Sequence, residues 1–336
     1  MNLRRTIVAA ISAALISATL IPCVVVGAPT KDSPARSRDV KPAQPSKPNE
    51  QIMTFPPDHS MGRLYLMTSH DPVTGTSWQK HHFAEAQGEV RVPAGGKVRL
   101  ELNYKGCADP SPLLKVNSSA LTAIDLRDLD NCDDKTLAVV GRVNSLTDVN
   151  CASCDVSNAG FASLTKLTHL TELDLQKTLI TGDGLVNLQK LPQLARLAIG
   201  YNQLTDDSLK NLEGLHHLRY LYVPACQLTD KALVHIAKLK TVETLELFNQ
   251  KVSDKGMEFL TALPNLSYLT LDGTYVDQNA VDSFRKMKHL RAVVMDLKYL
   301  KPAQIESIRK ALPPGAVVKA PRQGGVVGPE LLGPLH

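Results

Sequence analysis

Five leucines of this chain are separated by a constant interval of 24 residues: Leu167, Leu191, Leu215, Leu239 and Leu263. Val143 lies one interval earlier and Met287 one interval later. Within each unit, apolar residues recur 3, 6, 8, 13, 18 and 21 positions after the opening residue. A fixed period of this length is typical of a solenoid, in which each unit packs only against its neighbours.

The unit that begins at Leu215 shows the pattern in full: Leu218, Leu221, Val223, Cys226, Leu228, Thr229, Asp230, Ala232, Leu233 and Ile236. It resembles the leucine-rich repeat of bacterial proteins and is similar to the cysteine-containing and ribonuclease-inhibitor-like subclasses. The resemblance covers roughly 200 residues. It implies an α/β fold, a right-handed solenoid with a concave parallel sheet and outer helices. It also implies a binding scaffold, because the family has no shared active site.

Residues 118–318 are predicted to form about eight such units. The earliest unit fits the period only with one extra residue between Leu126 and Cys132. The last unit begins at Met287 and is degenerate, and residues 315–318 predict a closing strand.

Two polar positions within the unit have predictable roles. Position 11 lies where the chain leaves the strand, so we expect its side chain to bond buried backbone groups. Position 14 precedes a helical pattern and carries residues that favour N-caps. Position 11 is occupied by Cys154, Thr178, Asn202, Cys226, Gln250 and Thr274, and position 14 by Ser157, Thr181, Thr205, Thr229, Ser253 and Asp277.

Residues 58–117 have a different pattern and predict a small β module that caps the repeats. Apolar residues alternate over 90–92 and again over 98–102, and the segment Pro93-Ala94-Gly95-Gly96 lies between them. Two alternating runs around a glycine-rich turn predict a β-hairpin.

The N-terminus predicts export. Arg4 and Arg5 precede an uncharged apolar run, and small residues then favour cleavage after Gly27 or Ala28. Residues 1–28 are therefore expected to be a signal peptide, and the protein to be periplasmic, on the cell surface or secreted. Two alternatives remain, an uncleaved anchor and lipid attachment at Cys23, and only these would link the chain to a membrane. Residues 29–57 are rich in proline and predict a disordered linker, and residues 319–336 a disordered tail.

The distribution of charge excludes a nucleic-acid partner. The whole chain has a formal net charge of +5, but residues 118–312 contain 22 Lys and Arg against 23 Asp and Glu. A nucleic-acid binder would need a basic stripe on its folded surface, and the repeats have none.

The repeats also lack a recognisable catalytic motif, so we expect neither an enzyme nor a cofactor. Cys151 and Cys154 have the spacing of a metal-binding pair, but both fall on repeat positions and no second pair follows. We interpret them as structural and predict no metal site. A disulfide between Cys132 and Cys154 is an alternative for these neighbouring units.

Aromatic residues suggest where a ligand binds. The chain has only 15 Phe, Tyr and Trp, yet four of them fall on strand positions expected to face solvent. The predicted site consists of Tyr220, Tyr222, Phe248 and Tyr268, with Tyr201 beside them and Arg196, Glu246 and Asp272 at the border.

Exposed aromatic and arginine side chains are typical of protein-binding hot spots, so another protein is the predicted partner. A glycan or cell-envelope polymer stacked on the same rings is an alternative. A third is a structural surface spacer without a ligand, in which tyrosine is present because it suits strands.

Overall fold

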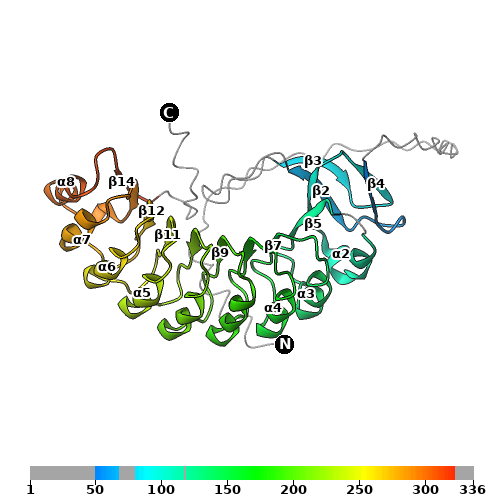
Figure 1. Cartoon of the computed structure of the whole chain (residues 1–336), viewed down its shortest axis with the longest axis horizontal. Coiled ribbons are helices and arrows are strands. Elements are labelled where there is room, and N and C mark those ends of the chain that lie inside the picture. Colours follow the sequence, from blue (N-terminus) through cyan, green and yellow to red (C-terminus); the bar gives the residue numbers. More distant parts are fainter. Residues whose placement is uncertain (1–49, 68–79, 117–118, 322–336) are drawn as a thin grey trace, which may run out of the picture. The chain divides into compact units, whose positions relative to one another are not determined.

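The computed structural model describes residues 50–67, 80–116 and 119–321, and all of them belong to one compact unit, Lys47–His336. In this described part, 12 strands form one sheet in the order β14-β13-β12-β11-β10-β9-β8-β7-β6-β5-β2-β3. The strands from β5 to β14 are parallel, and each pairs with that of the next repeat. Within this unit the strands line the inner side of the curve, and helices lie on the other side (Figure 1).

The repeat strands follow one another along the chain: β6 (Leu121–Asp125), β7 (Asp148–Asn150), β8 (Glu172–Asp174), β9 (Arg196–Ala198), β10 (Tyr220–Tyr222), β11 (Thr244–Glu246), β12 (Tyr268–Thr270), β13 (Ala292–Val294) and β14 (Val317–Lys319). Their register confirms the period, because Asp148, Glu172 and Arg196 are partners at intervals of 24 residues. Ala123 pairs with Asp148, 25 residues away, which confirms the extra residue of the first unit. The predicted closing strand is β14, which pairs with β13.

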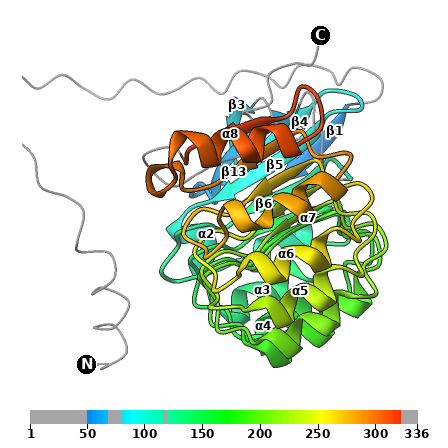
Figure 2. The same cartoon turned by 90° about the vertical axis from the view of Figure 1, so that its left-hand side faces the viewer.

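The outer elements are short, and several are 3-10 rather than α-helices. In chain order they are α3 (Asp134–Val140), α4 (Asn158–Leu164), η2 (Gly182–Lys190), η3 (Asp206–Leu212), α5 (Asp230–Ile236), α6 (Asp254–Leu260), η4 (Gln278–Ala280), α7 (Val281–Lys286), η5 (Leu297–Tyr299) and α8 (Pro302–Ala311). Figure 2 shows the α-helices of successive repeats stacked beside one another.

Between strands and outer elements lies the core, formed by the periodic leucines. Leu167, Leu191, Leu215, Leu239 and Leu263 are all buried in it, together with the other apolar positions of each unit. Burying one such side chain contributes about 1.5–3 kcal/mol. Because every leucine packs against those of the adjacent units, this stabilisation depends on the stack rather than on a single repeat.

The polar positions of the repeat have the roles predicted for them. At position 11, the Asn202 side chain donates to the carbonyls of Leu175 (2.7 Å) and Ile199 (3.0 Å) and accepts from the amide of Thr178 (2.9 Å). At position 14, the residue is the N-cap of an outer element in every unit from Ser157 to Asp277.

The cap residues also bond to an acidic residue of the preceding repeat, a role that was not predicted. The Asp230 carboxylate of one repeat accepts from the backbone amide of Ser253 in the next (2.8 Å) and from its hydroxyl (2.6 Å). Asp206 receives the same two bonds from Thr229, at 2.8 and 2.6 Å. The acidic residue of the first turn therefore connects adjacent repeats as well as complementing the helix dipole.

The N-terminal module consists of β1 (Gln51–Thr54), β2 (Gly62–Met67), β3 (Lys80–Glu85), β4 (Glu89–Val92), β5 (Lys97–Leu102), α2 (Tyr104–Ala108) and η1 (Ser111–Lys115). Its strand β5 pairs in parallel with β6, so the module continues the sheet of the repeats.

The predicted hairpin of residues 90–92 and 98–102 is wrong. The turn between them exists, since the amide of Gly96 donates to the carbonyl of Pro93 (2.9 Å), but the strands on either side belong to different sheets. β4 pairs with β1, and both edges of β5 are already occupied by β2 and β6. Alternation and a turn indicate two strands but not their partners.

Three other expectations concern the chain ends. Strand β1 lies within the predicted linker 29–57, and Met53 is buried, so the order of the module begins before residue 58. Residues 1–28, most of the linker and most of the tail 319–336 lie outside the described residues. The predicted signal peptide and Cys23 are therefore outside them as well.

Replacing Asp230 with Ala should lower the free energy of unfolding by about 2–3 kcal/mol, because two hydrogen bonds to a charged group are lost. Asp207→Ala is the matched control, since it removes a negative charge from the exposed side of a first turn. Its effect should be less than about 1 kcal/mol. Urea denaturation followed by circular dichroism measures both, and equal effects would contradict the role given to Asp230.

Candidate functional site

The sheet surface opposite the core, called here the strand face, is defined by two rows of side chains. They flank the buried core residue of each strand, because successive side chains of a strand point to opposite faces. The register assigns Arg99, Ala123, Asp148, Glu172, Arg196, Tyr220, Thr244, Tyr268 and Ala292 to the first row, and Glu101, Asp125, Asn150, Asp174, Ala198, Tyr222, Glu246, Thr270 and Val294 to the second. In the described strands β5 to β13, these rows contain six carboxylates and only two guanidinium groups.

Three predicted site residues form a connected chain across strands β9, β10 and β11. The Arg196 guanidinium lies over the ring of Tyr220, 3.7 Å from its centroid. The Tyr220 hydroxyl donates to Oε1 of Glu246. Tyr220 is therefore held between a cation on one side and a carboxylate on the other.

Next to this chain, three aromatic rings form a cluster. The ring of Phe248 makes edge contacts with Tyr222, at 5.6 Å between centroids, and with Tyr201, at 6.4 Å. Such edge-to-face arrangements are favoured by the charge distribution of aromatic rings. Tyr201 reaches the cluster from the turn after β9, where its backbone has φ 60°.

Positive φ is not a special feature of Tyr201. The equivalent position of six other repeats also has a positive φ, in Asp128, Ser153, Lys177, Ala225, Asn249 and Gly273. This conformation is rare for residues other than glycine and often marks functional strain. Here it belongs to the turn that every repeat uses to leave its strand.

The expectation that the predicted aromatic rings face solvent is wrong for three of them. Tyr220 is 2% exposed, Phe248 5% and Tyr268 0%, and the border residue Glu246 is also 0% exposed. Tyr201 is exposed at 38%, whereas Tyr222, Arg196 and Asp272 are half-buried.

Packing on the strand face explains this burial. Tyr220 is flanked in register by Arg196 and Thr244, and Tyr268 by Thr244 and Ala292. Tyr268 packs in a small cluster with Ala292 and Val294. Neighbouring strands lie only about 4.8 Å apart, so a ring beside small residues lies over them instead of projecting outward.

Two carboxylates at the border of the aromatic cluster carry unsatisfied atoms. Oε2 of Glu246 and Oδ1 of Asp272 are buried without a hydrogen-bond partner among the described residues, and so is Nη1 of Arg196. Burial raises the pKa of the Glu246 carboxyl to about 7, against the effects of the Tyr220 hydrogen bond and the Arg196 charge. Burial also raises the pKa of Asp272. The protein therefore holds desolvated acidic groups here without fully compensating them.

In another charged group on the strand face, both carboxylates are paired with one guanidinium group. Arg99 of β5 donates to Asp125 and to Asp148, both at 2.8 Å, and all three residues are buried. Sequence reasoning missed this group, because Arg99 lies outside the repeats and its partners are 26 and 49 residues away. It joins the module to the first two repeats and is structural in character.

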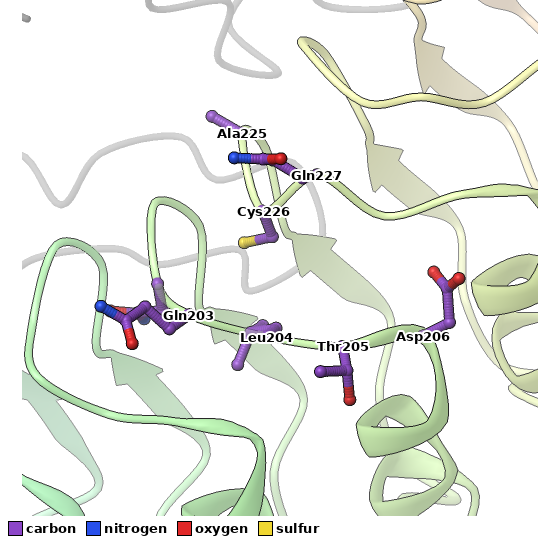
Figure 3. A pocket seen from close by; sticks show the side chains of 8 residues that line it. Gln203, Leu204, Thr205, Asp206, Ala225, Cys226 and Gln227 are labelled. Atoms are coloured by element: carbon purple, nitrogen blue, oxygen red, sulfur yellow. The ribbon is translucent and has the colours of Figure 1, made fainter.

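The structure also has a surface hollow of about 400 Å³ (Figure 3). It is lined by two neighbouring turns, which contribute residues 202–206 and Ala225, Cys226 and Gln227. The Cys226 thiol in its wall donates to the carbonyl of Pro224 (3.3 Å), as position 11 requires. The hollow is therefore the gap between successive turns.

The cysteines of the described part of the chain are Cys107, Cys132, Cys151, Cys154 and Cys226, and all five are buried free thiols. The disulfide between Cys132 and Cys154, which the sequence left as an alternative, is therefore not formed in the structure. Over residues 50–67, 80–116 and 119–321, no group of three or more His, Cys, Asp or Glu side chains could hold a metal ion.

Comparison with known proteins agrees with this fold. A leucine rich repeat family model matches residues 168–228. Together with the 24-residue register and the parallel sheet of the described residues, this match shows a leucine-rich-repeat solenoid. Folds of this class present extended binding surfaces and serve as protein-interaction domains in general.

Two solved structures illustrate the likeness. An internalin from Listeria monocytogenes is 23% identical with a TM-score of 0.46, over 55% of this chain and 50% of the internalin. The structure of PEPR1-AtPEP1 is 15% identical with a TM-score of 0.40, over 76% of this chain and 40% of the other. This chain therefore spans half or less of either structure. Among curated proteins, no sequence matches it.

Within the residues that the structure describes, no helix is both long and apolar enough to cross a membrane.

The raised pKa of Glu246 predicts a loss of stability with increasing pH. Its ordinary value is 4.5, so the folded carboxyl binds its proton more tightly than the unfolded one. The stabilisation is complete below pH 4.5 and is lost as the pH rises through about 7. At about 1.4 kcal/mol per unit of pKa difference, the loss is on the order of 3 kcal/mol.

Glu246→Gln should flatten this dependence between pH 4.5 and 7, because the amide cannot ionise. Glu306→Gln, on the exposed side of α8, serves as the control and should keep it. Urea midpoints measured across this range test the prediction. An unchanged slope in Glu246→Gln would show that another group titrates.

Proposed function

We propose that this chain is an exported binding protein that holds a protein partner on its strand face, over the repeats from Leu191 to Arg285. The supporting observation is the grouping of Tyr201, Tyr222 and Phe248 beside Glu246 and Asp272. Aromatic rings next to incompletely satisfied charged groups provide both the apolar area and the polar specificity of an interface.

The burial of Tyr220, Phe248 and Tyr268 changes how these residues contribute. A partner would touch the exposed ring of Tyr201 and the half-buried ring of Tyr222, while Phe248 supports both from below. Tyr220 and Arg196 would hold Glu246 in place. Tyr268 belongs to the packed surface around the site. Rigid, preorganised side chains lose little entropy on binding, which favours affinity.

Binding rather than catalysis is proposed because the polar groups of the site are distributed along a sheet surface. Export is supported by the sequence of residues 1–28, in which a positive N-terminus precedes an apolar run and small residues. Detection of the mature N-terminus in an extracellular or periplasmic fraction would test it. A chain found only in the cytoplasm would contradict export but not binding.

Replacing both Tyr201 and Tyr222 with Ala should weaken capture of the partner at least about tenfold, as expected when hot-spot rings are removed. The matched control is the double variant Tyr275→Ala and Tyr299→Ala, which removes two exposed tyrosines outside the cluster. Quantitative pull-down with the full chain measures both. The control should capture as the wild type does.

The alternatives give different results in this experiment. If purified envelope polysaccharide competes for the site, the ligand is a glycan rather than a protein. If the two double variants and the wild type are indistinguishable, the aromatic cluster does not bind a ligand and the chain is a structural spacer.

A further inference from the structure

The unsatisfied atoms of the site define the chemistry of what would fill it. Glu246 is fully buried and uses only one of its two oxygens, because Oε1 accepts from Tyr220 while Oε2 has no partner in the described structure. A buried polar atom without a partner is uncommon in folded proteins and calls for a specific explanation, such as a bound ligand. The free oxygen of Glu246 is a hydrogen-bond acceptor.

Asp272 supplies a second acceptor on the adjacent repeat. Glu246 pairs in register with Thr270, and Asp272 follows Thr270 by two residues, so it lies one position further along the same face. Its Oδ1 is likewise buried and without a partner among the described side chains. The two carboxylates are close enough to repel each other, and this repulsion contributes to the raised pKa of Glu246.

No cation of the described chain completes this pair. Arg196 is stacked on Tyr220, and its buried Nη1 is itself without a hydrogen-bond acceptor in the described residues. The carboxylates of Glu246 and Asp272 therefore offer two acceptors for a cation. Arg196, on the strand next to Tyr220, offers a donor for a carbonyl or carboxylate oxygen. A basic residue within a peptide carries both complementary groups, its side-chain cation and its backbone carbonyl.

We propose that the strand face takes a lysine or arginine side chain of a protein partner between Glu246 and Asp272. The proposal rests on the proposed function and adds the chemistry of the partner. The wider strand face agrees with it, since carboxylates outnumber guanidinium groups six to two in the rows from β5 to β13. The half-buried ring of Tyr222 next to the carboxylates can also contact a cation through its face.

Other acidic residues of the strand face are already satisfied, which distinguishes this place. Asp125 and Asp148 are paired with Arg99. Asp174 accepts from the backbone amide of Gln176 (3.0 Å) and, through both oxygens, from its side-chain amide. Asp174 therefore offers a control on the same face, equal in charge but without an unsatisfied oxygen.

The test measures binding of a fluorescent octalysine peptide to the full chain by anisotropy, at about 0.15 M salt to screen distant charges. Glu246→Gln and Asp272→Asn should each weaken binding about tenfold or more, whereas Asp174→Asn should change it less than about threefold. Equal losses in all three variants would overturn the proposal, because they would indicate a general attraction to an acidic surface.

A second measurement uses the unaltered protein and does not depend on the folding of a variant. Octalysine acetylated on every side chain has lost its cations and should not bind, and an octaarginine peptide should bind as octalysine does. Binding of the acetylated peptide with unchanged affinity would overturn the proposal.

The natural partner captured in the pull-down separates this proposal from the proposed function. One outcome is that the tyrosine double variant loses capture while Glu246→Gln and Asp272→Asn keep it in full. This result would leave the strand face as the binding surface but refute the cation site. Full capture by all of these variants refutes both.

Discussion

Each repeat of this chain completes its hydrogen bonds only through the next repeat. Strand amides donate to carbonyls one unit further on, as Ile199 does to Tyr222 and Val223 to Glu246. The side chains of Asn202 and Asp230 form the same kind of connection at the turns and helix starts. A backbone group buried without such a partner would cost free energy comparable to a lost hydrogen bond. The neighbouring unit is therefore a condition for the fold of each unit.

This constraint places the strands side by side and so creates the strand face. Residues 24 apart in the sequence become neighbours about 4.8 Å apart, which brings Arg196, Tyr220 and Glu246 into one connected chain. None of these residues is close to the others along the sequence. The same stacking brings acidic residues of separate repeats together, where they are desolvated and their pKa values rise.

The period made the architecture predictable, because register, core and cap positions follow from a constant interval. The N-terminal module was less predictable, since alternation marks Val90 and Val98 as strand residues but does not reveal that β4 pairs with β1. The strand positions of the proposed site residues followed from the period, whereas their exposure did not. Whether a tyrosine projects or lies flat depends on its neighbours in the adjacent repeats, such as Thr244 and Ala292 beside Tyr268.

Burial on the strand face strengthens the argument for a ligand at Glu246. An exposed carboxylate is solvated by water, and nothing would follow from its lack of a protein partner. Glu246 is 0% exposed, so its carboxylate cannot be solvated in this way. It is also not paired with Arg196, because the Arg196 guanidinium stacks on Tyr220. Evolution of stability alone would favour an apolar residue or a completed ion pair at this place, as Arg99 provides for Asp125 and Asp148. An incomplete charged group is the arrangement expected where the missing partner arrives with another molecule.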